Sequence, residues 1–134
     1  YNEPQNAFVA DFIGESNIID STMVEDRLVD ILGTKFVCVD EGFGNNQPVD
    51  VVIRPEDIVL TEPSKGIIKG RVTSAIFKGV HYEMEVQAAG FEWLVHSTVL
   101  KEPGSEVGIW VDPFNIQIMH KPESEDEKQE QYED

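Results

Sequence analysis

The sequence contains little of what marks secreted, membrane-spanning or nucleic-acid-binding proteins. Its single cysteine, Cys38, allows no internal disulfide, which suits a reducing compartment. No apolar stretch approaches the ~20 residues that a membrane-spanning helix needs, and no segment near the start resembles a secretory signal. Ten lysines and arginines stand against 26 aspartates and glutamates, so the formal net charge is -16.

This shortage of basic residues excludes two classes of partner. Nucleic acids and anionic lipid surfaces both bind to faces rich in lysine and arginine, and this chain has too few of them. An acidic chain favours cations instead, such as metal ions, polyamines or the basic face of another protein. The simpler alternative is that the charge serves only solubility.

The chain also lacks the motifs of common enzymes. No Gly-x-x-x-x-Gly-Lys-Ser/Thr loop is present to wrap phosphates, and no helix pattern follows the Gly-x-Gly at 42–44 to complete a dinucleotide site. Ser97 follows His96, but no nucleophile motif surrounds it. The three histidines, His81, His96 and His120, share no ligand spacing on one element, so we predict no metal site and no catalytic residue in this chain.

Short apolar runs separated by glycine and proline fill residues 17–120. Such runs are typical of an all-β protein, and we predict a small OB-like β-barrel over this range. We expect a strand break at Asp20-Ser21, and a bend or bulge at Gly70 within a long strand. Gly79 and Gly90 predict the turns of two hairpins.

The two ends of the chain differ from this range. Phe8 and Phe12 are four residues apart, which predicts a short amphipathic helix that ends at Gly14. Residues 1–16 are therefore expected to form a linker helix. Residues 121–134 contain no apolar side chain apart from Tyr132, and we predict a disordered acidic tail there.

The central stretch, residues 51–60, predicts a buried strand, a sharp polar turn and a second strand. Val51, Val52 and Ile53 form a continuous β-branched run, which suits a strand covered on both faces. Arg54-Pro55 ends the strand because proline has no N–H for the ladder. Glu56 and Asp57 follow at the corner. On these residues alone, an ordinary corner with Arg54 paired to Glu56 or Asp57 is the simpler interpretation.

The sequence Arg54-Pro55-Glu56-Asp57 after an apolar strand also resembles a junction motif. It is similar to the accessory domain that follows the ATPase domain in ATP-binding subunits of importer-type ABC transporters. Residues 1–17 resemble the end of that ATPase domain, and residues 70–79 and 110–116 resemble the strand pattern of the transport-associated OB module. Within the family, the opening segment and the Trp-Val-acid ending are most similar to the ATP-binding subunits of spermidine/putrescine importers.

This resemblance implies a role without catalysis. The parent subunit would be an ATPase that powers polyamine uptake on the cytoplasmic face of the bacterial plasma membrane. ATP and magnesium would bind an ATPase domain preceding Tyr1, which is not a methionine and therefore suits a fragment of a longer protein. This chain, expected to bind no cofactor, would regulate the subunit and contact a second copy of it. Its other partners would be its own ATPase domain and, indirectly, the membrane permease subunits.

The equivalent domain of a sugar, iron or phosphonate importer is an alternative to this role. A small-anion-binding OB module is another alternative, which the negative net charge of the chain disfavours.

The resemblance directs attention to residues that could bind a polyamine. Such a ligand carries several ammonium groups, so its site would combine carboxylates with aromatic walls along the methylenes. The candidates are Glu56, Asp57, Tyr82, Glu83, Glu85, Trp93 and Trp110. The simpler alternatives are a solvated hairpin face for the two hairpin glutamates and core or dimer packing for the tryptophans. As a further alternative, Glu83 and Glu85 could act as a pair of catalytic carboxylates, one acid and one base, as in glycosidases.

Overall fold

The structure, a computed structural model, describes residues 15–121 as an all-β fold. The described residues contain ten strands, three short 3-10 turns and no α-helix, which confirms the all-β part of the predicted fold. In chain order these are β1 Asn17–Glu25, β2 Leu28–Ile31, β3 Thr34–Val37, β4 Gln47–Ile53, η1 Pro55–Asp57, β5 Ile58–Thr61, η2 Pro63–Lys65, β6 Ile68–Phe77, β7 Tyr82–Ala88, β8 Phe91–Ser97, β9 Glu106–Val111, η3 Pro113–Asn115 and β10 Gln117–His120.

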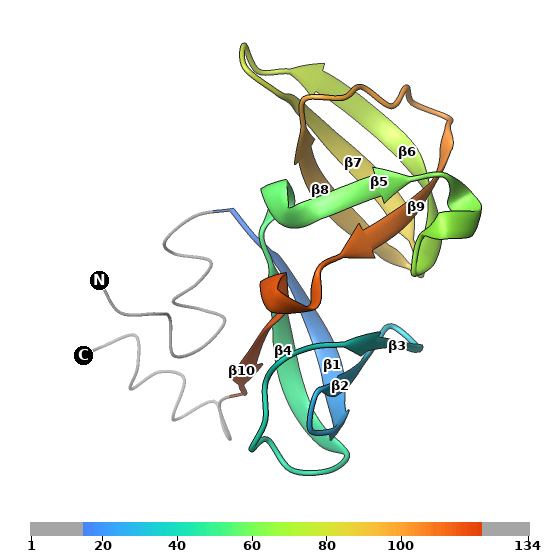
Figure 1. The fold of residues 1–134 in the computed structure, drawn as a ribbon. Helices are drawn as coiled ribbons and strands as arrows, with labels where there is room; N and C mark the ends of the chain where they lie inside the picture. Colours follow the sequence, from blue (N-terminus) through green and yellow to red (C-terminus); the bar gives the residue numbers. More distant parts are fainter. Residues whose placement is uncertain (1–14, 122–134) are drawn as a thin grey trace.

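The strands form two antiparallel sheets, where the sequence analysis expected one small barrel over residues 17–120. The first sheet, called sheet A, has the order β10-β4-β1-β2-β3, and the second, sheet B, has the order β5-β9-β6-β7-β8. Figure 1 shows the sheets as two halves of the molecule, joined by the connection from β4 through η1 to β5 and by the return from β9 through η3 to β10. Sheet B curls, so that its edge strands β5 and β8 approach each other.

β4 is an interior strand of sheet A, as its continuous apolar run predicts. It pairs with β1 on one side and with β10 on the other. Val51 and Ile53 belong to the main core, whereas Val52 points the other way and packs with Met119 and Ile18. The prediction of a strand covered on both faces is therefore confirmed.

One apolar core joins the two sheets. Its members come from both sheets, and Trp93 of β8 is the largest side chain that is fully buried. The indole N–H of Trp93 donates to the Ala88 carbonyl oxygen at 3.2 Å, so this polar atom is satisfied inside the core. The apolar core is therefore continuous from one half of the chain to the other.

Two local predictions were wrong. β1 runs unbroken through Asp20-Ser21, because the exposed Asp20 fits the alternation of a strand whose residues Ile19 and Met23 face the core. The bulge in β6 lies at Thr73, between the paired residues Val72 and Ser74, and not at Gly70.

Gly70 is needed for a different reason. A Cβ atom there would lie 2.7 Å from the Gln87 carbonyl oxygen and 2.8 Å from the Ala88 Cβ. The glycine thus permits close packing of β6 against β7. The expected turns at Gly79 and Gly90 are present, and both glycines have positive φ angles.

The predicted linker helix of residues 1–16 and the predicted acidic tail of residues 121–134 fall almost wholly outside the described residues. The proposed domain boundaries therefore stay predictions. In the described part of the chain, no helix has the length and apolarity to cross a membrane.

Candidate functional site

The Arg54-Pro55-Glu56-Asp57 motif forms η1, the tight turn that carries the chain from sheet A to sheet B. Arg54 has extended backbone, Pro55 begins the turn and is buried, and the Asp57 N–H donates to the Arg54 carbonyl oxygen at 3.0 Å. Within residues 15–121 no ion pair joins Arg54 to either carboxylate of the motif. The simple corner pairing considered for the sequence is therefore not formed, and Arg54 and Glu56 both face solvent.

The surroundings of Asp57 disfavour the charged form of its carboxyl group. Partial burial raises the pKa of Asp57, and the neighbouring Glu56 carboxylate raises it further, while the Arg54 guanidinium opposes both effects. The turn thus holds two like charges close together, one of them partly desolvated. A cation placed beside them would relieve this repulsion.

A cleft opens beside this turn, between β5 and the end of β8. Its volume is about 640 Å³. Glu56 lies at its border, β5 supplies an apolar wall, and two histidines and a lysine contribute polar groups. The lining residues are Glu56, Ile58, Val59, Leu60, His81, His96, Ser97, Thr98, Val99 and Lys101.

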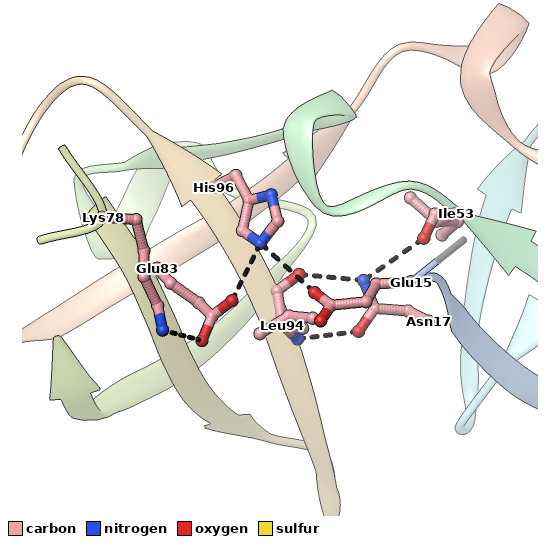
Figure 2. A network of polar contacts seen from close by, with 7 residues as sticks. All are labelled: Glu15, Asn17, Ile53, Lys78, Glu83, Leu94 and His96. Atoms are coloured by element: carbon pink, nitrogen blue, oxygen red, sulfur yellow. Dashed lines mark hydrogen bonds and ion pairs between the residues drawn. The ribbon is translucent and has the colours of Figure 1, made fainter. Parts of the chain in front are cut away.

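Next to the cleft, His96 lies between two carboxylates that come from distant parts of the chain. Its Nε2 atom is 3.3 Å from Oε1 of Glu83, the residue directly opposite on β7. The same nitrogen is 3.6 Å from Oε2 of Glu15, which precedes β1 (Figure 2). Lys78 approaches the second oxygen of Glu83 at 3.9 Å. This arrangement is called the His96 cluster below.

Asn17 holds Glu15 beside β8. Its side-chain amide donates to the Leu94 carbonyl oxygen at 2.9 Å and to the Ile53 carbonyl oxygen at 3.2 Å, while its oxygen accepts from the Leu94 N–H at 2.7 Å. Figure 2 shows these bonds alongside the His96 cluster. The start of β1 is therefore fixed to the strand that bears His96.

A second imidazole lies against the cluster. The rings of His81 and His96 have centroids 4.5 Å apart and planes 31° apart. His81 belongs to the loop between β6 and β7, where its carbonyl oxygen accepts from the Lys78 N–H at 2.8 Å. Two histidines that share no spacing in sequence thus meet in space.

The reasoning from sequence missed this cluster, although one signal pointed to half of it. The turn at Ala89-Gly90 sets the register of the β7–β8 hairpin, and Glu83 and His96 lie equally far from that turn. An antiparallel pair with this turn therefore places the two residues opposite each other. No comparable signal exists for Glu15 or His81, which reach the site through the tertiary fold.

The structure separates the residues suggested for polyamine binding. Trp93 is 0% exposed, on the core face of β8, whereas Glu83 and Glu85 lie on the other face of sheet B, so Trp93 forms no surface wall. Trp110 is 38% exposed on β9, opposite Val59. It is absent from the cleft lining.

Tyr82 and Glu85 have other neighbours. Tyr82 packs on Phe77, with ring centroids 5.0 Å apart, and one oxygen of Glu85 accepts from the Ser74 hydroxyl at 3.1 Å. Of the seven candidates, Glu56 lines the cleft, Asp57 adjoins it in the turn, and Glu83 contacts the lining residue His96.

Comparison with known proteins gives a consistent result. Residues 51–119 match the family model described as the TOBE domain. The chain is 61% identical over 93% of its length to the spermidine/putrescine import ATP-binding protein PotA of Acetivibrio thermocellus, and it covers 36% of that protein. It is 55% identical over 90% of its length to the protein of the same name from Desulfitobacterium hafniense, of which it covers 35%.

A solved structure has the same fold. The molybdate-bound form of the cytoplasmic molybdate-binding protein ModG superposes with a TM-score of 0.66 over 78% of this chain and 96% of the other, at 18% identity. The chain spans about a third of the length of the curated relatives it matches. With half of its residues matched by the family model, the chain belongs to the TOBE domain family.

Proposed function

We propose that this chain is the regulatory, dimer-contacting part of the ATP-binding subunit of a spermidine/putrescine importer. The observation that supports the proposal is the 61% identity over 93% of the chain to a protein named as a spermidine/putrescine import ATP-binding protein. ATP hydrolysis would belong to the rest of the subunit, because the loop needed to wrap phosphates is absent from this sequence. The subunit would act on the cytoplasmic face of the membrane, with a second copy and the permease subunits as partners.

The cleft beside η1 is the proposed place for a regulatory polyamine. Glu56 and Asp57 would bind one ammonium group, where their mutual repulsion already favours a cation. Ile58 and Leu60 offer an apolar wall for the methylenes, and Glu83, which contacts the lining residue His96, offers a further carboxylate. Binding there would shift how the ATPase parts of two subunits close, which gives feedback inhibition by internal polyamine.

Inhibition of ATP hydrolysis tests this proposal. Replacing the matching part of the Acetivibrio thermocellus relative with this chain gives a full-length subunit whose hydrolysis rate can be followed as spermidine is added. We expect spermidine to slow hydrolysis, and Glu56→Gln to raise the inhibiting concentration by about tenfold, since a hydrogen bond to a charged group contributes about 1.5–3 kcal/mol.

Glu92→Gln is the matched control, because Glu92 is an exposed carboxylate of β8 that does not line the cleft. It should leave inhibition unchanged. Equal inhibition of the subunit with and without this chain would refute the regulatory role.

A further inference from the structure

The His96 cluster brings three metal-binding side chains together. One nitrogen of His96 and one carboxylate oxygen each from Glu15 and Glu83 lie within 4.8 Å of one another. The three residues come from the segment before β1, from β7 and from β8, so the fold, and not local sequence, assembles them. Figure 2 shows both carboxylates directed at the same imidazole nitrogen.

The spacing of these atoms fits coordination better than direct hydrogen bonding. The nitrogen–oxygen distances are 3.3 Å to Glu83 and 3.6 Å to Glu15, longer than the ~2.9–3.0 Å typical of N–H···O bonds. At zinc–ligand bond lengths of ~2.0–2.2 Å, two ligands of a tetrahedral ion lie roughly 3.3–3.6 Å apart. The donors are already separated by that amount. The Glu15 side chain, which is 65% exposed, can adjust to close the remaining gap to Glu83.

The charge of the cluster also favours a bound cation. A neutral imidazole has one N–H, so at Nε2 it can donate to one of the two carboxylates at a time. The Lys78 amine, 3.9 Å from Glu83, is a positive charge at the edge of this cluster. Two carboxylates therefore face one imidazole nitrogen in a chain with a net charge of -16.

The donor set selects the class of metal. Imidazole nitrogen suits zinc and other first-row transition ions, whereas magnesium and calcium prefer sites built from oxygen alone. Three protein ligands leave one position of a tetrahedral ion open, and the His81 ring stacks on the His96 ring beside the site. Both histidines line the cleft, which gives an ion a path from solvent.

We propose that Glu15, Glu83 and His96 form a binding site for a divalent transition metal, with Zn²⁺ as the preferred ion and the stacked His81 ring as a support for His96. The bound ion would tie the segment before β1 to the β7–β8 hairpin. It would reinforce the link between the two sheets that Asn17 makes through hydrogen bonds. The site shares Glu83 and the cleft with the proposed polyamine site, but it depends on His96, whereas the polyamine site depends on Glu56.

Cobalt and zinc titrations of the metal-stripped chain at pH 7.5 test this site. Visible absorption reports Co²⁺ coordination, calorimetry gives the Zn²⁺ affinity, and thermal melting follows the stability gained on binding. We expect one ion per chain. His96→Gln and Glu83→Gln should each weaken binding at least tenfold, and His81→Gln should weaken it less.

The controls separate the site from general attraction to an acidic chain. His120→Gln removes a histidine on β10 that packs against Phe43, and Glu92→Gln removes an exposed carboxylate of β8, so both should bind metal like the parent. Glu56→Gln should also leave metal affinity unchanged, which distinguishes this inference from the polyamine proposal. Lys78→Gln removes a competing cation beside Glu83 and should tighten binding.

Three results would overturn the proposal. The first is equal metal affinity of the parent and of a His96→Gln variant that circular dichroism shows to be folded. The second is loss of metal binding in His120→Gln. The third is a dissociation constant above about 1 mM for both Co²⁺ and Zn²⁺. Lys78→Gln keeps the test decisive if the ligand variants misfold, because weaker or unchanged binding in that variant would contradict the assigned position.

Discussion

At the scale of single residues, Asn17 shows how one buried amide can hold two sheets together. It is 3% exposed, and its side chain bonds to both backbone groups of Leu94 and to the Ile53 carbonyl oxygen. β1, β4 and β8 therefore meet at this side chain. No apolar residue of similar size could satisfy these backbone groups.

We predict that Asn17→Ala destabilises the fold by about 2–4 kcal/mol. The substitution strands the Leu94 N–H and two carbonyl oxygens, and each buried group left without a partner costs about 1–3 kcal/mol, partly offset by water entering the site. Urea denaturation monitored by tryptophan fluorescence measures the change, because Trp93 is buried in the core.

Gln87→Ala is the matched control for this prediction. Gln87 is exposed and makes one long contact, 3.4 Å to Glu92, so its loss should change the free energy of unfolding by less than about 0.5 kcal/mol. Similar effects of the two substitutions would show that Asn17 does not join the sheets.

At the scale of elements, the crossing of β9 with the segment around η2 requires glycine on both sides. A Cβ atom on Gly108 would lie 2.6 Å from the Glu62 carbonyl oxygen, and one on Gly66 would lie 2.4 Å from the Gly108 Cα. The backbones thus pass at a distance that no side chain allows. This contact holds the connection from β5 to β6 against sheet B.

Gly108→Ala should therefore destabilise the fold by about 3 kcal/mol, the upper end of what overpacking usually costs, because backbone atoms must move. Thermal melting of the folded chain provides the measurement. Gly104→Ala serves for comparison, since a Cβ there meets no atom within 4 Å and only its φ of +92° is strained. That variant should lose only about 1–2 kcal/mol. A Gly108→Ala variant as stable as the parent would show that the crossing is looser than described.

The elements also show what the sequence could and could not predict. The hairpin turns at Gly79 and Gly90, the central strand ending at Arg54 and the absence of long helices from the described residues all follow from local patterns. The division into two sheets does not, because β4, which ends at Ile53, pairs with β10, which begins at Gln117, across the 63 intervening positions 54–116. The His96 cluster depends on that same long-range packing, except for the pair of Glu83 and His96.

At the scale of the whole molecule, two similar turns carry the chain between the halves. η1 and η3 each begin with a proline after an extended residue, Arg54 or Asp112, and each ends at a buried isoleucine, Ile58 or Ile116. The chain leaves sheet A through the first turn and returns through the second (Figure 1). The described part of the chain has two covalent links between the sheets, and a ligand beside η1 would lie at one of them. Binding at this link can change the orientation of one sheet relative to the other.

We propose that the cleft beside η1 recognises a polyamine and not merely positive charge. Calorimetric titration of the chain with spermidine at near-physiological salt tests it most directly, with magnesium and molybdate as comparison ligands. We predict saturable binding of spermidine that survives added salt and weakens about tenfold in Glu56→Gln. Affinity should also fall as the pH is lowered through the raised pKa of Asp57, because protonation removes one of the two carboxylates. Weak heat that magnesium reproduces and salt abolishes would contradict the claim, and the acidic surface would then be a general attractor of cations.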